Sequence, residues 1–302
     1  TASCWKKAGI PEERIYYFGK DDNWWIAGET GPCGPDTEMF YDTGKPKCSP
    51  ECNPSCGCGK YVEIWNNVFM EFYKDENGKY SKLKQHNVDT GLGLERMAML
   101  LQGKETPFET ELFTPIMDKL VELEKVDNIA SRRIVAEHLR SSMMIICDGG
   151  RPSNVDRGYI LRRLIRRMVR HMNKLQISLD ELVTLIDLNV ENLKEMYPSL
   201  EINKETIKTV IIEEKDKFVK TLVKGEKEFE KEVGQVKAQG ENIVPGKVVF
   251  RLYDTYGFPP EVTEELATES GMSIDKEEFE KLFKEHQEKS RAGSEQKFKG
   301  GL

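Results

Sequence analysis

Residues 89–97 place Asp89 and two glycines next to the start of an amphipathic segment, in the order Asp-Thr-Gly-Leu-Gly-Leu-Glu-Arg-Met. The glycines allow a ligand to approach the backbone closely, and a helix expected at 93–102 would present its first turn to that ligand. Arg96 lies in this first turn, where a cation is unfavourable for the helix dipole unless it faces an anion. The stretch therefore indicates an anion-binding turn, although a plain strand-to-helix turn would use the same residues.

Four of the seven cysteines lie within eleven residues, at Cys48, Cys52, Cys56 and Cys58. Zinc prefers soft ligands in a tetrahedron, and the prolines and glycines between these cysteines allow the chain to bend around one ion. In a reducing cytoplasm, crowded thiols favour a metal site over disulfides. The cluster therefore predicts structural Zn²⁺ in a loop at 44–60, with free thiols, an iron–sulfur cluster and disulfides as alternatives.

Positive charge is concentrated between residues 132 and 174, where eleven Lys/Arg stand against three Asp/Glu. This window carries +8 in a chain of net charge −7, and such an asymmetry is typical of a polyanion-binding face. Five arginines form one stripe of a predicted helix at 157–175: Arg162, Arg163, Arg166, Arg167 and Arg170. No acid is interleaved among them, so we expect this face to meet solvent or a nucleic-acid backbone.

The elements that must position these residues change character near residues 103–110. Residues 13–90 contain short apolar and aromatic runs between turn residues, and Asn77-Gly78 is a strong hairpin signal, so this part is expected to be an antiparallel sheet. The later spacing is helical. It predicts helices at 109–125, 131–147, 157–175, 178–195, 203–236, 259–269 and 275–291.

The 302 residues are therefore expected to form an α+β protein with two domains. The first would span 1–108 and contain the Cys-rich insertion, the second would span 109–290, and a linker or tail would follow at 291–302. No apolar run approaches the ~20 residues of a membrane span, and the first residues lack the charged-then-apolar pattern of a signal peptide, so a cytoplasmic location without a membrane is expected. The first residue is Thr1, which suggests a fragment.

Five stretches in order along nearly the whole chain resemble the alanyl-tRNA synthetase family, which is a class II aminoacyl-tRNA synthetase family. They are residues 21–38, 61–72, 88–96, 151–167 and 250–259. The Gly-Leu-Gly-Leu-Glu-Arg box within them resembles class II motif 3. The resemblance implies part of a class II antiparallel sheet, followed by an all-helical tRNA-recognition domain.

An alanine site is the first implication of this resemblance. Asp89 would pair with the substrate ammonium, Gly91 would keep the floor of the pocket low, and Trp25 and Val68 would form its walls. A zwitterion with one methyl group needs a buried carboxylate and a small apolar wall. The two apolar residues could instead be ordinary strand core.

The resemblance also implies a site for ATP and Mg²⁺, with Arg96 on the γ-phosphate and with Gly93 and Glu63 beside the nucleotide. Arg96, Glu63 and Asn66 are the implied catalytic residues. Glu63 and Asn66 are three residues apart and would face opposite sides of a flat strand, so a bulge or bend is predicted. Asn66 could instead lie in the alanine pocket. We expect Asp89 and Arg96 to line one cavity.

The implied reaction begins with attack of the alanine carboxylate on the α-phosphorus of ATP, which gives alanyl-adenylate and pyrophosphate. The terminal hydroxyl of tRNA(Ala) then takes the alanyl group. Class II motifs 1 and 2 and the family's editing domain are not found in the sequence, so this chain alone is not expected to be active. The alternative function is a non-enzymatic RNA-binding module on the same scaffold.

Asn154 and Asp254 resemble the pair that reads a G·U base pair in the tRNA acceptor stem. Side chains of this kind can read base edges in the wide minor groove of RNA. The resemblance therefore implies tRNA binding by this pair together with the five arginines. Asp254 could instead be a turn residue in Tyr-Asp-Thr-Tyr-Gly-Phe-Pro.

Overall fold

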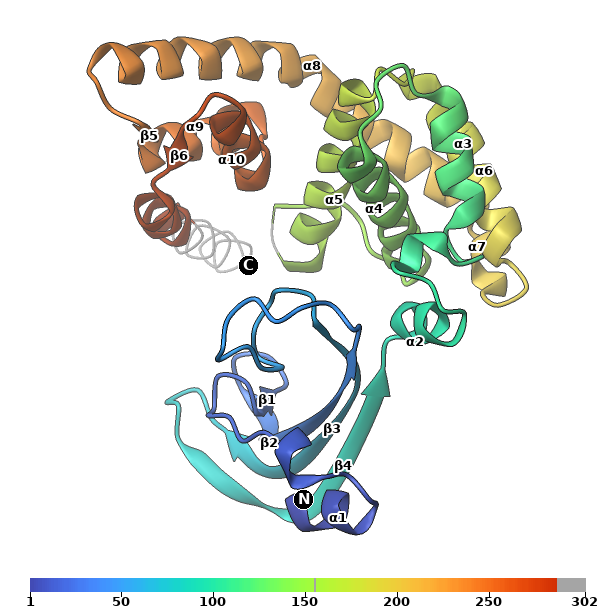
Figure 1. Ribbon diagram of the computed structural model, residues 1–302. Coiled ribbons are helices and arrows are strands. Elements are labelled where there is room, and N and C mark those ends of the chain that lie inside the picture. The colour runs from blue at the N-terminus through green and yellow to red at the C-terminus, as the bar shows by residue number, and fades with distance from the viewer. Residues whose placement is uncertain (155, 287–302) are drawn as a thin grey trace, which may run out of the picture. The chain divides into compact units, whose positions relative to one another are not determined.

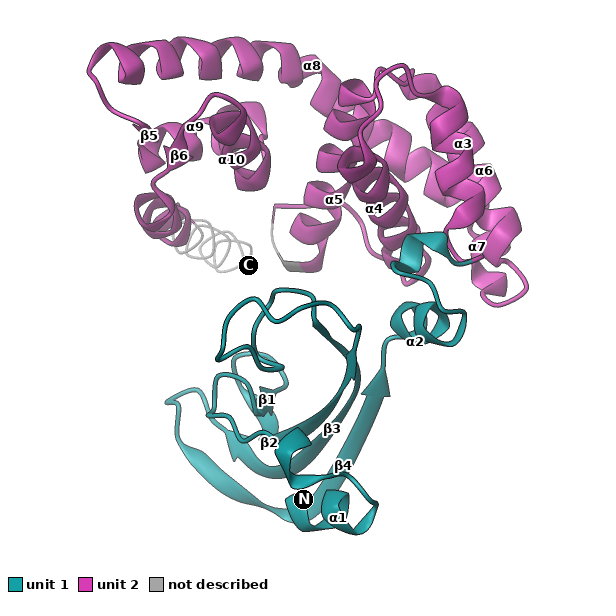
Figure 2. Cartoon of the chain, viewed as in Figure 1, with its two compact units in different colours: residues 1–110 teal, residues 111–302 magenta. Residues whose placement is uncertain are grey.

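The computed structural model describes residues 1–154 and 156–286, and the chain divides into two compact units, Thr1–Thr110 and Glu111–Leu302 (Figures 1 and 2). The predicted tail at 291–302 and the end of the helix predicted at 275–291 lie outside the described residues. In the described part of the chain, no helix is both long and apolar enough to cross a membrane.

Unit 1 is built on a four-stranded antiparallel sheet with the order β1-β2-β3-β4. Its strands are β1 (Trp24–Ile26), β2 (Gly31–Asp42), β3 (Tyr61–Lys74) and β4 (Tyr80–Leu92). A tight turn at Asn77-Gly78 joins β3 to β4, and Gly78 has the positive φ of 76° that favours glycine. The hairpin predicted from this dipeptide is therefore confirmed.

Unit 1 also contains two short α-helices and two 3₁₀ turns. They are α1 (Ala2–Lys7), η1 (Glu12–Arg14), α2 (Leu94–Leu101) and η2 (Pro107–Glu109). Among the described residues β4 pairs with β3 alone, so it forms one edge of the sheet and is exposed along most of its length.

Strand β3 is irregular at the position where the sequence predicts a bulge. Met39 of β2 lies opposite Trp65, whereas the next residue, Phe40, lies opposite Glu63. Ile64 is therefore the extra residue of the bulged strand. This shift confirms the predicted irregularity, and it returns Glu63 to the face of the sheet that Asn66 occupies.

The part of unit 2 that the structure describes is helical apart from one short parallel strand pair, β5 (Ile243–Val244) with β6 (Ser273–Ile274). The helices and 3₁₀ turn are α3 (Thr114–Leu123), α4 (Ile129–Cys147), α5 (Asp156–Lys174), η3 (Leu179–Glu181), α6 (Leu182–Leu193), α7 (Pro198–Ile202), α8 (Lys204–Ala238), α9 (Gly246–Tyr256) and α10 (Pro260–Glu269), and residues 276–286 are also helical. The predicted α+β class is confirmed, but α7 and α9 were not predicted.

The core of unit 2 forms around α5 and the long helix α8. The apolar stripe of α5 is fully buried at Leu161, Ile165 and Met168. Near the middle of α8, Gly225 lies against the ring of Phe258, which is itself fully buried. A Cβ atom at position 225 would lie 2.2 Å from that ring, so the close contact requires glycine.

Candidate functional site

Four of the sequence-predicted residues meet across β3 and β4. Val68 lies opposite Asp89, and Asn66 lies opposite Gly91. Directly opposed residues of antiparallel strands point to the same face of a sheet, so these four share one face. Val68 is buried, but Asp89 and Gly91 are exposed because β4 is an edge strand of the described sheet. The expectation of a buried carboxylate at Asp89 is therefore wrong for this structure.

Trp25 lies in a different part of the sheet. It is on the short strand β1, opposite Gly34 of β2, and 37% of its surface is exposed. Its neighbour Trp24 packs its ring against Phe72 and Tyr80, each with centroids 5.7 Å apart. The sheet register does not place Trp25 opposite any residue of β3 or β4, where Val68 and Asp89 pair. Its role as a pocket wall therefore stays a prediction.

Arg96 and Glu63 contact each other, as expected of two residues in one site. Gly93 precedes α2, and Arg96 in the first turn of that helix donates from Nη1 to the backbone carbonyl and to Oε2 of Glu63. Both distances are 3.0 Å. The two side chains remain about 49% and 36% exposed, so a ligand can reach the pair.

Two acids on β2, Asp36 and Glu38, join this face, although neither is among the site residues predicted from the sequence. Asn66 Nδ2 donates to Oε1 of Glu38 at 2.9 Å, and Asn23 Nδ2 donates to Oδ1 of Asp36 at 3.4 Å. Burial raises the pKa of Glu38 to about 7, and repulsion from Glu63 and Asp36 adds to the effect. Burial also raises the pKa of Asp36. Acids at i and i+2 of a strand share a face, and this spacing was the available signal.

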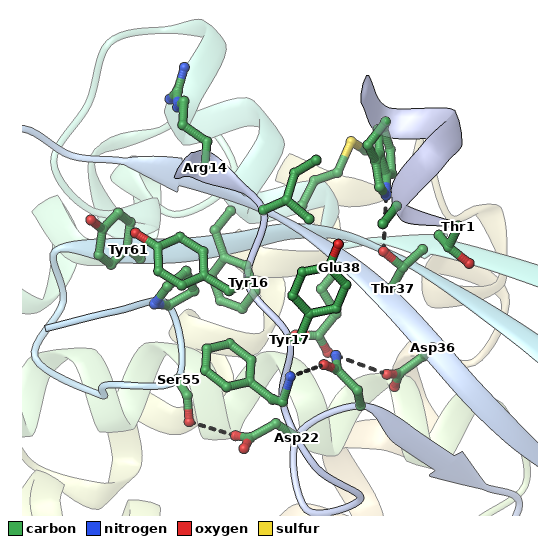
Figure 3. Close-up of a pocket in the computed structure, with 18 of the residues that line it drawn as sticks. Thr1, Arg14, Tyr16, Tyr17, Asp22, Asp36, Thr37, Glu38, Ser55 and Tyr61 are labelled. Carbon is green, nitrogen blue, oxygen red and sulfur yellow. Dashed lines mark hydrogen bonds between the residues drawn. The ribbon is translucent and has the colours of Figure 1, made fainter. Parts of the chain in front are cut away.

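A cavity of about 600 Å³ lies beside β2 in unit 1 (Figure 3). Asp36 and Glu38 line it together with the rings of Tyr16 and Tyr17. Neither Asp89 nor Arg96 lines this cavity, in contrast to the expectation of a shared one. The structure connects the predicted residues through one face of the sheet instead.

The four clustered cysteines form a compact group of thiols in the loop between β2 and β3. Their Sγ atoms all lie within 4.8 Å of one another, and Cys48 and Cys56 are 3.2 Å apart. Four sulfurs around one Zn²⁺ at about 2.3 Å would lie about 3.8 Å apart, which fits this spacing. All four are free cysteines, and the group could hold a metal such as zinc.

Polar contacts hold the base of this loop to the sheet. Lys60 Nζ donates to Oδ1 of Asp42 and to the carbonyl of Lys45, both at 2.8 Å. Ser55 Oγ donates to Oδ1 of Asp22 at 2.6 Å, and both residues line the cavity (Figure 3). The cysteine group therefore lies on a loop that is anchored at Asp42, the last residue of β2, and at Asp22.

A second cleft, of about 300 Å³, lies in unit 2. Asn154 precedes α5, Asp254 lies in the last turn of α9, and both line this cleft although they are 100 residues apart in sequence. Asp254 is helical, so the alternative of a simple turn residue is wrong. Arg162 donates to Oδ1 of Asn154, and His286 Nε2 lies 3.6 Å from Oδ1 of Asp254.

The five arginines of the predicted stripe on α5 all have acidic partners, in contrast to the expectation of an uncompensated basic face. Each arginine forms an ion pair with an acid of α8 or α10: Arg162 and Arg166 with Glu214, Arg163 with Glu261, and Arg167 and Arg170 with Glu265. These acids are 48 to 98 residues away in sequence, so local charge counting could not detect them. Of the five arginines, Arg162, Arg163 and Arg166 line the cleft.

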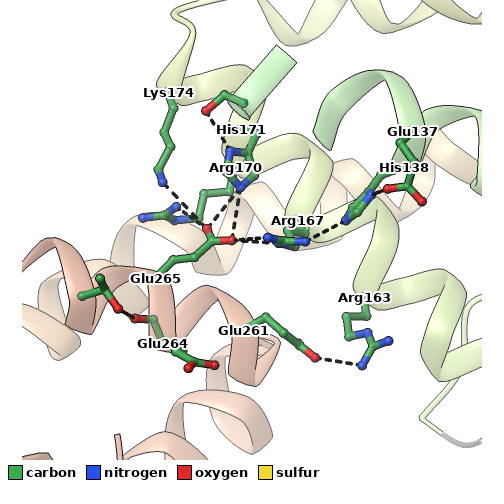
Figure 4. Close-up of polar contacts among 12 residues, drawn as sticks. Glu137, His138, Arg163, Arg167, Arg170, His171, Lys174, Glu261, Glu264 and Glu265 are labelled. Atoms are coloured by element: carbon green, nitrogen blue, oxygen red, sulfur yellow. Dashed lines mark hydrogen bonds and ion pairs between the residues drawn. The ribbon is translucent and has the colours of Figure 1, made fainter. Parts of the chain in front are cut away.

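The degree of burial separates these arginines into two groups. Only 8% of Arg166 and 4% of Arg170 is exposed, so the prediction that the whole stripe faces solvent or RNA is wrong at these two positions. Glu265 accepts from Arg167 and Arg170 at 2.8 Å (Figure 4). Burial opposes the charged form of Glu265, but a hydrogen bond from His171 and the charges around it outweigh burial and lower its pKa to about 2.

Comparisons with known proteins give consistent matches over the whole chain. The family of class II tRNA synthetases (A) matches residues 1–300. An alanine–tRNA ligase of Borrelia hermsii is 48% identical over the full chain and one of Treponema denticola is 50% identical, and the match covers 52% of each relative. One of Natranaerobius thermophilus is 43% identical over 96% of the chain and 34% of that relative. The chain thus spans about half or less of the length of these relatives.

Proposed function

The chain belongs to the family of class II tRNA synthetases (A), and on this basis we propose that it forms part of an alanine–tRNA ligase. The full-length protein would activate alanine with ATP to give alanyl-adenylate and pyrophosphate, and would then transfer the alanyl group to tRNA(Ala). Such displacements are catalysed mainly by positioning and charge stabilisation. The groups on the sheet face can supply both without a side-chain nucleophile.

The observation that carries this proposal is the common face of β3 and β4. In the proposed binding mode, Asp89 pairs with the ammonium of alanine, the methyl group packs on Val68, and Gly91 leaves room for the substrate. The sheet register supports this arrangement because Val68 and Asp89 are directly opposed. Trp25 is proposed as a further wall from its sequence context alone.

The nucleotide would lie where Arg96 meets Glu63. A planar guanidinium suits phosphate oxygens, and Arg96 is exposed enough to exchange its contact with Glu63 for one with the γ-phosphate. Oxygen atoms of Glu63 and Asn66 would hold Mg²⁺, a cation that prefers such ligands. Asn66 Oδ1 is buried and has no hydrogen-bond partner among the described residues, which fits this role. The bound ion would neutralise phosphate charge.

Alanine-dependent exchange of pyrophosphate into ATP tests the activation step, and the assay uses the full-length protein. We expect exchange with alanine and much less with glycine or serine. Full exchange with another amino acid and none with alanine would indicate a different ATP-dependent ligase. Tight RNA binding without any exchange would instead support a non-enzymatic RNA-binding module.

For tRNA, we propose that Asn154 and Asp254 read the G·U pair of the acceptor stem. Their position in one cleft supports this role, because groups from distant segments converge there. Arg162 and Arg163 are proposed to contact the neighbouring phosphates. Arg167 has the same proposed role from sequence alone, whereas the buried Arg166 and Arg170 are better suited to support the cleft.

A comparison of two acceptor-stem RNAs tests this assignment, one with the G·U pair and one with G·C at that position. Asn154→Ala and Asp254→Ala should lower the preference for G·U, and pyrophosphate exchange should be unchanged. Asp118→Ala in α3, an exposed acid away from the cleft, is the control. An equal loss in exchange and charging would contradict a role in RNA recognition.

We further propose that the four cysteines hold one structural Zn²⁺. Their spacing supports this assignment, and their loop position suggests support of the fold rather than chemistry. Metal analysis of purified protein should find one zinc per chain, and Cys52→Ser should lower that content and make the loop sensitive to protease. Full retention of zinc in the variant would exclude this site. A cytoplasmic location stays a prediction.

A further inference from the structure

The charged residues between α5 and α10 form a ladder that spans the two helices (Figure 4). Its α5 members follow one another at helical spacing, and so do its α10 members. The ladder pairs Arg163 with Glu261, Arg167 and Arg170 with Glu265, and Arg170 and Lys174 with Glu269. Because each step is displaced by about one helical turn, the ladder fixes the register of α10 along α5.

Helix α10 is joined closely to the helix that carries Asp254. Asp254 lies in the last turn of α9, and Gly257, Phe258 and Pro259 connect that helix to α10. Phe258 is fully buried and packs its ring against Phe218 at 5.8 Å. A shift of α10 along α5 would therefore displace this connection and the end of α9 with it.

Arg166 adds a direct contact between α5 and the connection. Its Nη1 donates to the carbonyl of Gly257 at 2.5 Å, and its Nε donates to Glu214 of α8 at 2.7 Å. Gly257 has a φ of 69°, and a Cβ atom there would lie 1.8 Å from Nη1 of Arg166. Glycine is thus required twice, for the left-handed conformation and for the approach of the guanidinium.

From these contacts we propose that Glu265 is a positioning residue for recognition of the acceptor stem. It sets the distance between Asn154 and Asp254 by holding α10, and hence the end of α9, against α5. This inference rests on the proposed function of that pair. It assigns the buried arginines of α5 a geometric role in specificity in addition to any contact with phosphate.

The position of Glu265 supports this role. The Glu265 carboxylate accepts from Arg167 and Arg170, lies 3.1 Å from His171 Nε2 and lies 3.8 Å from Lys174 Nζ. It therefore connects four side chains of α5. No other acid in the described part of the ladder contacts as many. Glu269 has a weaker position because its side chain is about half exposed.

The test uses the full-length enzyme with Glu265→Gln, which keeps the size of the side chain and removes its charge. We expect the ratio of kcat/KM for the G·U stem over the G·C stem to fall by about tenfold, because a change within a connected network shifts specificity by this order. Pyrophosphate exchange should be unchanged. Glu269→Gln should lower the ratio less. Glu264→Gln is the matched control. Glu264 lies in the same helix, α10, and the change removes only its exposed ion pair with Lys276.

A change in discrimination, rather than in total activity, is the result that a merely structural role would not produce. Equal loss of kcat/KM for both stems in Glu265→Gln would overturn the proposal. If Glu265→Gln does not fold, an unchanged ratio in Glu269→Gln would overturn it in the same way. If Asp254→Ala also leaves the ratio unchanged, the assignment of the G·U pair fails; if only the glutamate variants do so, the positioning role alone fails.

Discussion

The sheet face of unit 1 and the arginine face of α5 use charge in opposite ways. On the sheet face, burial raises the pKa values of Glu38 and Asp36, and repulsion from neighbouring acids adds to the effect. On α5 the charges are matched within the chain, and the pKa of Glu265 is lowered to about 2. The face that seemed the most charged in the sequence is therefore the best compensated one in the fold.

This difference indicates where each region has capacity for a ligand. A bound cation or ammonium group stabilises acids that repel one another, because its positive charge offsets their repulsion. The ion pairs between α5 and α10 are already neutralised, so an added ion would stabilise them little. Their role is to hold the two helices in register. We therefore expect substrates to act strongly on the sheet face, whereas substitutions in the ladder should act on stability and geometry.

The largest expected effect is on stability, in Glu214→Leu. Glu214 is 1% exposed and pairs with the buried Arg166, so its loss leaves an uncompensated buried charge. Such losses cost about 3 to 5 kcal/mol. Urea unfolding followed by far-ultraviolet circular dichroism measures the change. A cost below about 1 kcal/mol, the usual range of surface pairs, would break the comparison by showing that the arginine face is not compensated from within.

The next effect is on activity, in Asp89→Ala. If Asp89 holds the ammonium of alanine, alanine-dependent exchange in the full-length enzyme should fall by about a hundredfold or more, because one partner of a charge pair is removed. Glu76→Ala in the turn between β3 and β4 is the control, as an exposed acid of the same unit. Normal exchange at ordinary alanine concentration would remove Asp89 from the site.

The dependence of stability on pH should differ in sign between the two regions. Because the pKa of Glu38 is raised from 4.5 to about 7, its contribution to stability falls as the pH rises from 4.5 to 7. Glu265 has a lowered pKa, so its contribution is present above pH 4.5 and is lost as the pH falls toward 2. Near neutral pH, Glu38 thus lowers the stability of unit 1, whereas Glu265 contributes to the stability of unit 2.

Tryptophan fluorescence can isolate the first of these contributions, since all four tryptophans lie between residues 5 and 65 of unit 1. Urea unfolding monitored this way at several pH values should give a smaller pH slope for Glu38→Gln than for the unsubstituted protein. Glu29→Gln, an exposed acid in unit 1, serves as the control. Identical slopes in all three proteins would show that Glu38 titrates normally.

The smallest expected effect is in Arg163→Gln. Its ion pair with Glu261 is partly exposed, so the loss of stability should be about 0.2 to 1 kcal/mol. If Arg163 contacts phosphate, RNA affinity should weaken for every sequence and the salt slope should fall by about one. RNA titrations at several salt concentrations measure both. An unchanged salt slope would indicate that this arginine, too, belongs to the scaffold alone.

The fold class and several local features were predictable because their signals are local. The Asn77-Gly78 turn needs only its own residues. The bulge between Glu63 and Asn66 follows from the period of a strand once the resemblance assigns both residues to one site. Helix α9 was not predicted, since its Val-Val-Phe run favours a strand locally. Burial of Val249 and Leu252 in the core of unit 2 overrides that preference.

The sequence could select candidate site residues, but it could not predict their environment. The resemblance selected Asp89, Asn154 and Asp254, and it could not reveal the exposure of the first or the convergence of the other two. The partners of the α5 arginines come from α8 and α10, and sequence spacing carries no record of such contacts. Glu38 was missed for the related reason that burial and neighbouring acids, rather than a motif, change its ionisation.

The contact between Gly225 and Phe258 restricts how this protein can vary. Replacing an interior helical glycine by alanine ordinarily improves helix formation by about 1 kcal/mol, so drift toward alanine would be favoured in an isolated helix. At position 225 the added methyl would meet the aromatic ring and dislodge it. A substitution there becomes acceptable only after a smaller side chain replaces Phe258, so the two positions are expected to evolve together.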